Sequence, residues 1–324
     1  MTKAGLHTRA RAVALAVAIA AIAAAAAAAG CGDGDAAGGG PVVIYVSVDR
    51  EFAEPVLADL GRELGLDVRA KYDTEETKST GLLNELVALR ERPKADLFWC
   101  GDTARAELLR SRGVVEPWRP VSLRGRVLLV HTRRLPDEAA WPRSVEALAD
   151  PRFRGTGAMA SPVFGTTSVH AAALFARWGD ERARAFFEAV KANGTRILGS
   201  NGDVRRAVAT GEAAFGLLDT DDAETAAKDG APVALVWPDQ GEGGMGVLLI
   251  PNAVAIVRGG PHPEAARRAA DALVRPAVAA RLAAAGAGLP GPPPGVRAME
   301  VDVLVLARKL DETRELLRAF AATP

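Results

Sequence analysis

Short apolar runs alternate with amphipathic segments along most of this chain. Residues 42–48 form the first apolar run and predict a strand, and residues 51–64 place Phe52, Val56 and Leu60 at helical spacing. Two further pairs repeat this order: strand 66–72 with helix 77–90, and strand 96–100 with helix 103–112. Strands that alternate with helices are typical of an α/β sheet with parallel strands and crossover helices.

A second series follows residues 113–120, a stretch with two prolines and no period. It predicts strands at 126–132, 157–161, 196–200, 213–219 and 233–237, and helices at 166–177, 180–192, 203–210 and 221–229. Residues 247–257 predict another strand, broken at Pro251-Asn252. The remaining expectations are a helix over 263–286 that Pro276 kinks, a Gly- and Pro-rich loop over 286–295, and an amphipathic helix at about 297–321.

Two α/β lobes, with the chain crossing between them more than once, predict a two-lobe clamshell with one sheet in each lobe. The expected parts of the mature chain are residues 41–120 as the first part of lobe 1, 121–240 as lobe 2, 241–290 as the second part of lobe 1, and 291–324 as a C-terminal helix that packs on the lobes. Ligands of open α/β sheets bind beyond the carboxyl ends of the strands. The turns from strand to helix are therefore the places to inspect.

Residues 1–30 are predicted to be a secretory signal. Lys3, Arg9 and Arg11 precede an unbroken small and apolar run that ends just before Cys31. Small residues before a cysteine resemble the bacterial lipoprotein box, in which Cys31 is lipidated after cleavage, and residues 31–40 then form a flexible leash. The alternative is an uncleaved membrane anchor, since about 18 apolar residues can span a bilayer. Either way we expect an extracytoplasmic protein, in the periplasm or at the cell surface, tethered to a membrane.

Composition narrows the classes of function. Apolar residues make up 49% and charged residues 25% of the chain, which excludes wholesale disorder and a polytopic membrane protein. Without the signal, the chain contains 37 basic and 40 acidic residues, so it has no excess of positive charge with which to bind nucleic acid. If Cys31 carries lipid, Cys100 has no partner in the chain and no disulfide is expected. We expect a monomer stabilised by its core.

Hydroxyl, amide and glycine residues occupy several of the strand-to-helix turns. Gly165, Thr166 and Thr167 open a helix, where hydroxyl groups and free backbone N–H groups together suit an anion, and Asn201 can add amide donors. Ordinary N-capping favours the same residue types and is the alternative. Ser47 and Thr74 follow the first and second strands and are further candidate ligand contacts.

Carboxylates recur at the same turns in both lobes. Asp49 and Asp102 follow strands of lobe 1, and Asp221 and Asp222 follow a strand of lobe 2. Closing the clamshell would bring these acids around a cation such as Fe³⁺, Ca²⁺ or Mg²⁺, or around an organic ammonium group. N-capping again competes for each acid taken singly.

No arrangement nominates a nucleophile with its base, and the sequence contains no P-loop, G-x-S-x-G or dinucleotide-binding fingerprint. The four histidines show no zinc spacing, and His170 is expected in the core. We expect a binding protein with no catalytic cofactor. A secreted enzyme on the same scaffold is a distant alternative.

Five motifs carry a resemblance to a known family: Tyr45-Val-Ser-Val-Asp49, Tyr72-Asp-Thr-Glu75, Ala95-Asp-Leu-Phe-Trp99, Gly165-Thr-Thr167 and Asp219-Thr-Asp-Asp222. In this order and spacing the mature chain resembles the substrate-binding lipoproteins of bacterial ABC importers, and most closely the group called ferric iron-binding. The resemblance implies a type II periplasmic binding protein that closes on its solute and delivers it to a membrane permease.

In iron binders of this family a His, a Glu and two adjacent Tyr hold Fe³⁺, and a phosphate-like anion completes the shell. The resemblance puts Asp49 at the His position, Asp102 at or beside the Glu position, and Asp221 and Asp222 at the Tyr pair. The anion-holding positions fall near Thr166, on Asn201 and near Asp219. The chain departs from the pattern because Tyr45 and Tyr72 are its only tyrosines and neither lies in lobe 2.

The resemblance therefore implies a binding protein for ferric iron with phosphate or carbonate as the accompanying anion. An aminophosphonate or another small organic anion is the alternative, with its phosphonate on Thr166, Thr167 and Asn201 and its ammonium on Asp221 or Asp222. Carboxylates in place of the tyrosines keep hard oxygen donors, so both solutes stay open at this point.

Overall fold

The computed structural model describes residues 40–73 and 80–322. The predicted signal and lipidated Cys31, and the candidate contact Thr74, lie outside the described residues. Lobe 1 begins with β1 (Val42–Val46), α2 (Arg50–Leu64), β2 (Val68–Tyr72), α3 (Thr80–Ala88), β3 (Leu97–Cys100) and α4 (Thr103–Ser111). Each of these elements lies where the hydrophobic pattern predicts it.

The helix α2 shows why the pattern works. Val56, Leu57 and Leu60 are buried on one face of the helix, and the exposed residues fall between them. The helix ends at Gly65, which has a φ of 63° and donates its backbone N–H to the carbonyl of Gly61. A residue without a side chain adopts this left-handed conformation at no steric cost, so the sequence itself terminates the helix here.

Lobe 2 repeats the strand and helix order. Three short 3-10 turns, η1 (Glu138–Ala140), η2 (Val145–Ala149) and η3 (Pro151–Phe153), precede its strands. Its elements are β5 (Gly157–Ala160), α5 (Gly165–Trp178), α6 (Asp180–Ala192), β6 (Arg196–Leu198), α7 (Asn201–Ala209), β7 (Phe215–Asp219), α8 (Thr220–Lys228) and β8 (Val233–Val236). All were predicted within a few residues.

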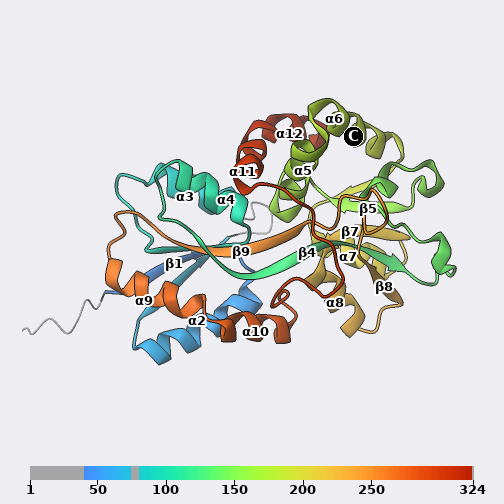
Figure 1. Cartoon of the computed structure of the whole chain (residues 1–324). Coiled ribbons are helices and arrows are strands. Elements are labelled where there is room, and N and C mark those ends of the chain that lie inside the picture. Colours follow the sequence, from blue (N-terminus) through green and yellow to red (C-terminus); the bar gives the residue numbers. More distant parts are fainter. Residues whose placement is uncertain (1–39, 74–79, 323–324) are drawn as a thin grey trace, which may run out of the picture. The chain divides into compact units, whose positions relative to one another are not determined.

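The lobes share one long strand, β4 (Arg119–His131), of 13 residues. Its first part pairs antiparallel with β9 (Leu249–Ile256) and its second part with β7 and β8. The strand order is β2-β1-β3-β9-β4-β7-β5-β6, so the strands form one continuous sheet and not the separate sheets that we expected (Figure 1). Within each lobe the pairs β1–β2, β1–β3, β5–β6 and β5–β7 are parallel, as predicted.

The predicted break of the 247–257 strand at Pro251-Asn252 is wrong, because β9 runs through both residues. Pro251 pairs with Leu123 where the β4–β9 register shifts, a place where a missing N–H is tolerated. The buried amide of Asn252 donates to Ser122 Oγ (2.6 Å) and its Oδ1 accepts from Trp99 Nε1 (3.2 Å). These partners satisfy the polar side chain inside the sheet.

Both faces of the sheet are covered by helices. On β3, Trp99 packs in the cluster with Leu57 of α2, while the preceding Phe98 packs on the other face with Leu83 of α3. Lobe 2 divides its core in the same way between two clusters on opposite faces. Successive residues of a strand point to opposite faces, so a strand buried on both sides is apolar throughout.

The C-terminal part differs in detail from the prediction. Instead of one kinked helix there are two, α9 (Pro263–Leu273) and α10 (Pro276–Ala285), because Arg275 takes an extended conformation before Pro276. The predicted helix at 297–321 is also two helices, α11 (Val303–Glu312) and α12 (Arg314–Ala322).

Helix α11 contacts α4 of lobe 1 and α5 of lobe 2 (Figure 1). Leu306 and Leu310 of α11 share a buried cluster with Ala104 of α4 and Val169 of α5. This apolar contact joins the lobes on one side. None of the helices in the described ranges is long and apolar enough to cross a bilayer.

Candidate functional site

A cavity of about 770 Å³ lies between the lobes. Its walls are the residues that follow β1 and β3 in lobe 1 and β5, β6 and β7 in lobe 2. Ten of the predicted site residues line it: Ser47, Asp49, Asp102, Gly165, Thr166, Thr167, Asn201, Asp219, Asp221 and Asp222. The structure thus brings together every predicted site residue that it describes, and their binding roles stay predictions.

A buried arginine organises the lobe 2 wall. Arg126 of β4 has no exposed side-chain surface, and its Nη1 donates to Asp219 Oδ1 (2.7 Å), Thr166 Oγ1 (3.1 Å) and Asn201 Oδ1 (3.3 Å). Its Nη2 donates to Thr167 Oγ1 (3.1 Å). One guanidinium therefore connects three strand-to-helix turns.

Asp219 is the acceptor at the centre of this network. Its Oδ2 accepts from Thr166 Oγ1 (2.6 Å) and from Asn201 Nδ2 (3.1 Å). Burial alone would raise the pKa of Asp219, but the guanidinium groups of Arg126 and Arg124 together outweigh it, and the pKa is lower than usual. Asp219 is ionised, and the threonine hydroxyls are bound within the wall instead of capping their own helix.

A second buried arginine, Arg124, stands at the junction of the lobes. It lies two residues before Arg126 and so on the same face of β4. Its Nη2 donates to the carbonyl of Gly101 in lobe 1 (3.0 Å), and its Nη1 faces Asp221 Oδ2 (3.4 Å) and Asp219 Oδ2 (3.6 Å) in lobe 2. Burial opposes the charge of Arg124, but these acids raise its pKa.

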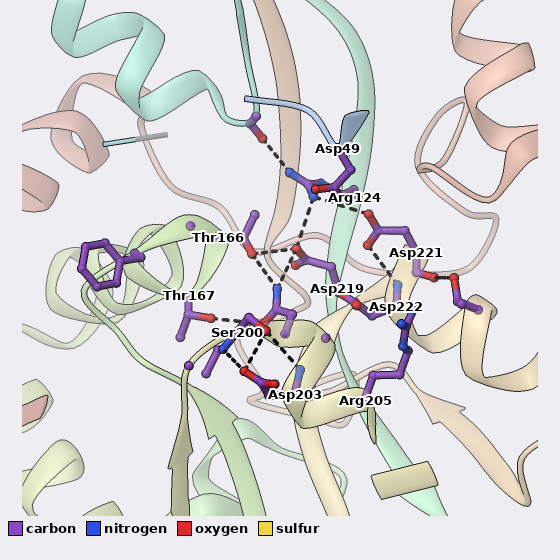
Figure 2. Close-up of a pocket in the computed structure, with 18 of the residues that line it drawn as sticks. Asp49, Arg124, Thr166, Thr167, Ser200, Asp203, Arg205, Asp219, Asp221 and Asp222 are labelled. Atoms are coloured by element: carbon purple, nitrogen blue, oxygen red, sulfur yellow. Dashed lines mark hydrogen bonds and ion pairs between the residues drawn. The ribbon is translucent and has the colours of Figure 1, made fainter. Parts of the chain in front are cut away.

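The carboxylates of lobe 2 form a tight group. Oxygens of Asp219, Asp221 and Asp222 lie within 4.8 Å of one another, a spacing that could hold a cation. Loss of hydration, and then the charges of Asp221, Asp219 and Asp49, raise the pKa of Asp222 well above its usual value. Figure 2 shows Asp49 of lobe 1 beside Arg124, so an acid of the opposite wall reaches the same group.

Asp102 is bound elsewhere. Its Oδ1 accepts from the backbone N–H of Arg105 (2.7 Å), which caps α4, and its Oδ2 pairs with Arg105 Nη1 (2.7 Å). Arg105 is buried and also donates to Ser168 Oγ (2.7 Å) and to the carbonyl of Gly165 (3.3 Å). One carboxylate oxygen of Asp102 thus caps α4 and the other holds the arginine that links α4 to α5, so Asp102 is not among the proposed ligands.

Positive helix ends point into the cavity. The helices α2, α5 and α8 begin at Asp49, Phe164 and Asp219, and none of these residues caps its helix through a side chain. The first backbone N–H groups of such helices suit an anionic group. Gly165 has a φ of 55°, which favours glycine at the start of α5.

Ser47 completes the lobe 1 wall. It is 2% exposed, and its Oγ has no hydrogen-bond partner among the described residues. A buried hydroxyl without a partner costs free energy, so it is a natural contact for a solute.

The prediction that His170 lies in the core is confirmed. It is 2% exposed, and burial, followed by the charge of Arg126, lowers its pKa to about 3. Cys100 is buried as well, and burial raises its pKa, so its thiol stays protonated. The two tyrosines do not line the cavity.

Sequence reasoning missed Arg124 and Arg126. A signal was present, because Arg124 and Arg126 stand at positions i and i+2 next to the apolar run that follows them and so share one face of the strand. Buried cations on one face need anionic partners, and the strand-end aspartates supply them.

Comparison with known proteins identifies the family and the fold of the chain. Residues 54–287 match the family described as bacterial extracellular solute-binding protein, and the chain belongs to that family. A curated relative, an uncharacterized protein of Haemophilus influenzae, is 25% identical over an alignment of 230 residues that covers 63% of this chain and 65% of the relative. The chain thus matches somewhat less than two thirds of that relative's length.

Solved structures establish the fold. A ferric binding protein from Campylobacter jejuni has a TM-score of 0.75 at 17% identity, covering 86% of this chain and 99% of its own. Iron-bound HitA from Pseudomonas aeruginosa has a TM-score of 0.73 at 19% identity, covering 86% and 99%. The periplasmic binding protein AfuA from Actinobacillus pleuropneumoniae, solved with fructose-6-phosphate, has a TM-score of 0.71 at 18% identity, covering 87% and 97%. The predicted type II periplasmic binding protein fold is confirmed.

Proposed function

We propose that this chain is the solute-binding component of an ABC importer, and that its solute is a small organic molecule with an anionic group and with hydroxyl or ammonium donors. Membership of the extracellular solute-binding family supports the transport role and the permease as partner. The solute proposal is supported by the size of the cavity and by the charges on its walls.

The observation that carries the proposal is Arg124 inside the acid group. The guanidinium of Arg124 already faces Asp219 and Asp221 at 3.6 and 3.4 Å, so a metal ion there would have to displace this positive charge or bind beside it. The cavity of about 770 Å³ is also of the size that holds small organic molecules, about 300–1,000 Å³. Both features favour an organic solute over a single ion.

The walls offer complementary contacts for such a solute. Asp221, Asp222 and Asp49 accept hydrogen bonds from hydroxyl or ammonium groups, while the start of α5 attracts an anionic group. A hexose phosphate and an aminophosphonate both combine these features. The similar protein AfuA was solved with fructose-6-phosphate, which supports the first of these classes.

Ferric iron with phosphate or carbonate is the second candidate. It is favoured by the three carboxylates within 4.8 Å and by the similarity to iron-bound HitA. Its ligands would be Asp221 and Asp222, at the positions of the tyrosine pair in the iron binders that the chain resembles, and Asp49, at the position of their histidine. Arg124 would have to turn away for this ion to bind.

Thermal shift and calorimetric titration with three probes would separate the candidates: fructose 6-phosphate, 2-aminoethylphosphonate, and Fe³⁺ with citrate or phosphate. A bound solute raises the melting temperature by mass action. We expect an organic probe to stabilise metal-free protein and Asp221→Asn to abolish the rise. Asp229→Asn, an exposed acid at the end of the same helix, is the matched control. Stabilisation by iron alone would contradict the proposal.

We further propose that Cys31 is lipidated and tethers the protein to a membrane outside the cytoplasm. The small residues before Cys31 support this role. Cys31→Ser should release the full chain into the soluble extracytoplasmic fraction and abolish labelling by a radioactive fatty acid, while Cys100→Ser should change neither.

A further inference from the structure

A buried arginine of lobe 1 reaches across to lobe 2 directly behind the cavity wall. Arg105 of α4 is 3% exposed and does not line the cavity. Its Nη2 donates to Ser168 Oγ (2.7 Å) and its Nη1 to the carbonyl of Gly165 (3.3 Å), and both acceptors belong to the first turn of α5. One side chain of lobe 1 therefore holds the start of a lobe 2 helix.

Lobe 1 fixes this arginine from its own side. Asp102 Oδ2 pairs with Arg105 Nη1 (2.7 Å), and Thr80 Oγ1, at the start of α3, lies 3.5 Å from Arg105 Nη2. Asp102 is 1% exposed, so water does not compete for this charge-assisted hydrogen bond. The guanidinium thus has its anionic partner in lobe 1 and neutral acceptors in lobe 2.

The turn that Arg105 holds has no polar side chain at the usual capping position. Phe164, the residue before α5, makes no capping hydrogen bond through its side chain. The carbonyl of Gly165 instead accepts from Ser168 Oγ (2.7 Å) as well as from Arg105. Gly165 and the next residue, Thr166, line the cavity. A displacement of this turn would therefore move the cavity wall itself.

Apolar side chains adjoin the link. Ala104 of α4 and Val169 of α5, the sequence neighbours of Arg105 and Ser168, are buried in one cluster with Leu306 of α11. Hydrogen bonds to a guanidinium are stronger where water is excluded. The link is therefore placed where it can fix the distance between the starts of α4 and α5.

Building on the proposed function, we propose that Arg105 is a positioning residue that holds the cavity-lining start of α5 against lobe 1 in the arrangement that binds solute. Arg105 itself does not touch the solute, because it does not line the cavity. It acts through Gly165 and Ser168, by raising the fraction of molecules whose two walls are in the binding arrangement. The apparent affinity is proportional to that fraction, whatever the chemistry of the solute.

Calorimetric titration of Arg105→Gln tests this role with fructose 6-phosphate, 2-aminoethylphosphonate, and Fe³⁺ with citrate. We expect the affinity for every probe that binds wild type to fall by one common factor of about 10- to 100-fold, the usual worth of hydrogen bonds to a charged group. A loss confined to one of several binding probes would assign Arg105 to the recognition of that solute and overturn the positioning role.

Ser168→Ala is a milder variant of the same link. It removes the hydroxyl that accepts from Arg105 in lobe 2 and leaves the ion pair of Arg105 with Asp102 in place. Binding should weaken by about three- to tenfold, the worth of one hydrogen bond. If Arg105→Gln does not fold, Ser168→Ala decides alone, and an unchanged affinity would overturn the proposal.

Arg110→Gln is the matched control for the loss of an ion pair on α4. Arg110 pairs with Glu107 (2.6 Å), three residues away, as Arg105 pairs with Asp102. Glu107 is buried, and neither Glu107 nor Arg110 lines the cavity. We expect Arg110→Gln to lower the melting temperature and to leave the affinity of the tightest probe within about twofold of wild type. A loss of affinity equal to that of Arg105→Gln would make the effect merely structural.

A double-mutant cycle identifies the route of the effect. If Arg105 acts through its contacts with α5, Ser168→Ala should cause no further loss of affinity in the Arg105→Gln background. Fully additive losses would mean two independent effects and would contradict this route. Arg105→Lys keeps a positive charge beside Asp102 and should recover part of the affinity. A folded Arg105→Lys that binds no better than Arg105→Gln would also contradict it.

The outcomes separate this inference from the proposed function. If an organic probe binds wild type, and Arg105→Gln and Ser168→Ala bind it equally well, the role of Arg105 is overturned and the proposed function stands. If only Fe³⁺ with citrate binds wild type, and both variants bind it more weakly, the role of Arg105 is supported and the organic solute is overturned. If no probe binds wild type at millimolar concentration, both fail.

Discussion

The two walls of the cavity are built differently. On the lobe 2 wall, Arg126 ties Thr166, Thr167, Asn201 and Asp219 into one buried network. On the lobe 1 wall, Ser47 Oγ has no partner among the described residues, and Asp102 serves the link between α4 and α5. One wall has its hydrogen bonds formed before any solute arrives, and the other keeps a donor for the solute.

This difference follows from the topology. Three helices start at the ends of β5, β6 and β7 and place hydroxyl, amide and carboxylate groups side by side, and β4 brings Arg124 and Arg126 against them. In the part of lobe 1 that the structure describes, β1 and β3 end at the cavity. Binding to a preorganised wall orders few additional side chains and so costs little entropy. We therefore expect the lobe 2 wall to fix the orientation of the solute, while the lobe 1 wall adds contacts when the lobes close.

Removing the central arginine should have the largest effect. Arg126→Met leaves Asp219 buried without its nearest counter-ion, and breaking such a pair costs about 3–5 kcal/mol of the free energy of unfolding. Urea unfolding measures it. Arg119→Met on the same strand removes an exposed pair with Asp271 and should cost less than about 1 kcal/mol. Equal losses of unfolding free energy in the two variants would show that the buried network of lobe 2 stabilises the fold no more than an exposed ion pair does.

The buried His170, which belongs to α5 of the same wall, should make the stability of the protein depend on pH. Its pKa is about 3 in the folded chain and about 6.5 when unfolded, so the unfolded chain binds the extra proton and stability falls as pH drops below about 6.5. At pH 4, protonation of His170 in the unfolded chain should lower the free energy of unfolding by up to about 3 kcal/mol. His170→Leu should remove that part of the acid sensitivity, measured as the free energy of unfolding between pH 8 and pH 4. Parallel curves for the two proteins would refute the assignment.

Asp222 lies where the two walls meet. It should change the pH dependence of stability less than His170 does, and in the opposite direction. Because its pKa is raised in the folded chain, its contribution to stability is complete below the unfolded pKa of about 3.9 and is lost as pH rises through the folded pKa. Asp222→Asn imitates the protonated form, so it should raise the melting temperature by about 2 °C at pH 8 and not at pH 4. Asp229→Asn should leave both values unchanged.

The smallest stability effect is expected on the lobe 1 wall. Ser47→Ala removes a hydroxyl that has no partner among the described residues, so the free energy of unfolding should change by less than about 0.5 kcal/mol. Binding of the tightest probe should nevertheless weaken by about three- to tenfold, the worth of one hydrogen bond. An unchanged affinity would remove Ser47 from the site.

Local patterns predicted much of this molecule. Hydrophobic period located the strands and helices, and the rule that ligands bind at strand ends selected Asp49, Asp221, Asp222 and their neighbours, which the structure gathers at one cavity. Local pattern could not show where donors point. Thr166 was predicted as an anion contact, but its hydroxyl donates to Asp219, 53 residues away in sequence.

The arginines were missed for a related reason. Arg126 reaches the cavity because β4 pairs antiparallel with β7, which sets Arg126 opposite Asp219. That register depends on two segments more than 90 residues apart, and nothing local to either one specifies it. The helix break at Thr313 was missed, and the break at Arg275 was predicted only as a kink at Pro276, because an amphipathic period can continue across a short interruption.

The sharing of β4 limits how the molecule can be dismantled. A strand that is hydrogen-bonded to β9 at one end and to β7 and β8 at the other belongs to both halves, so no single peptide bond can be cut to yield two independent domains. Grafting one half onto a relative would require transplanting this strand along with neighbours on each side. Recombination within such a scaffold is therefore expected to exchange loops and helix ends, and to leave the central ribbon intact.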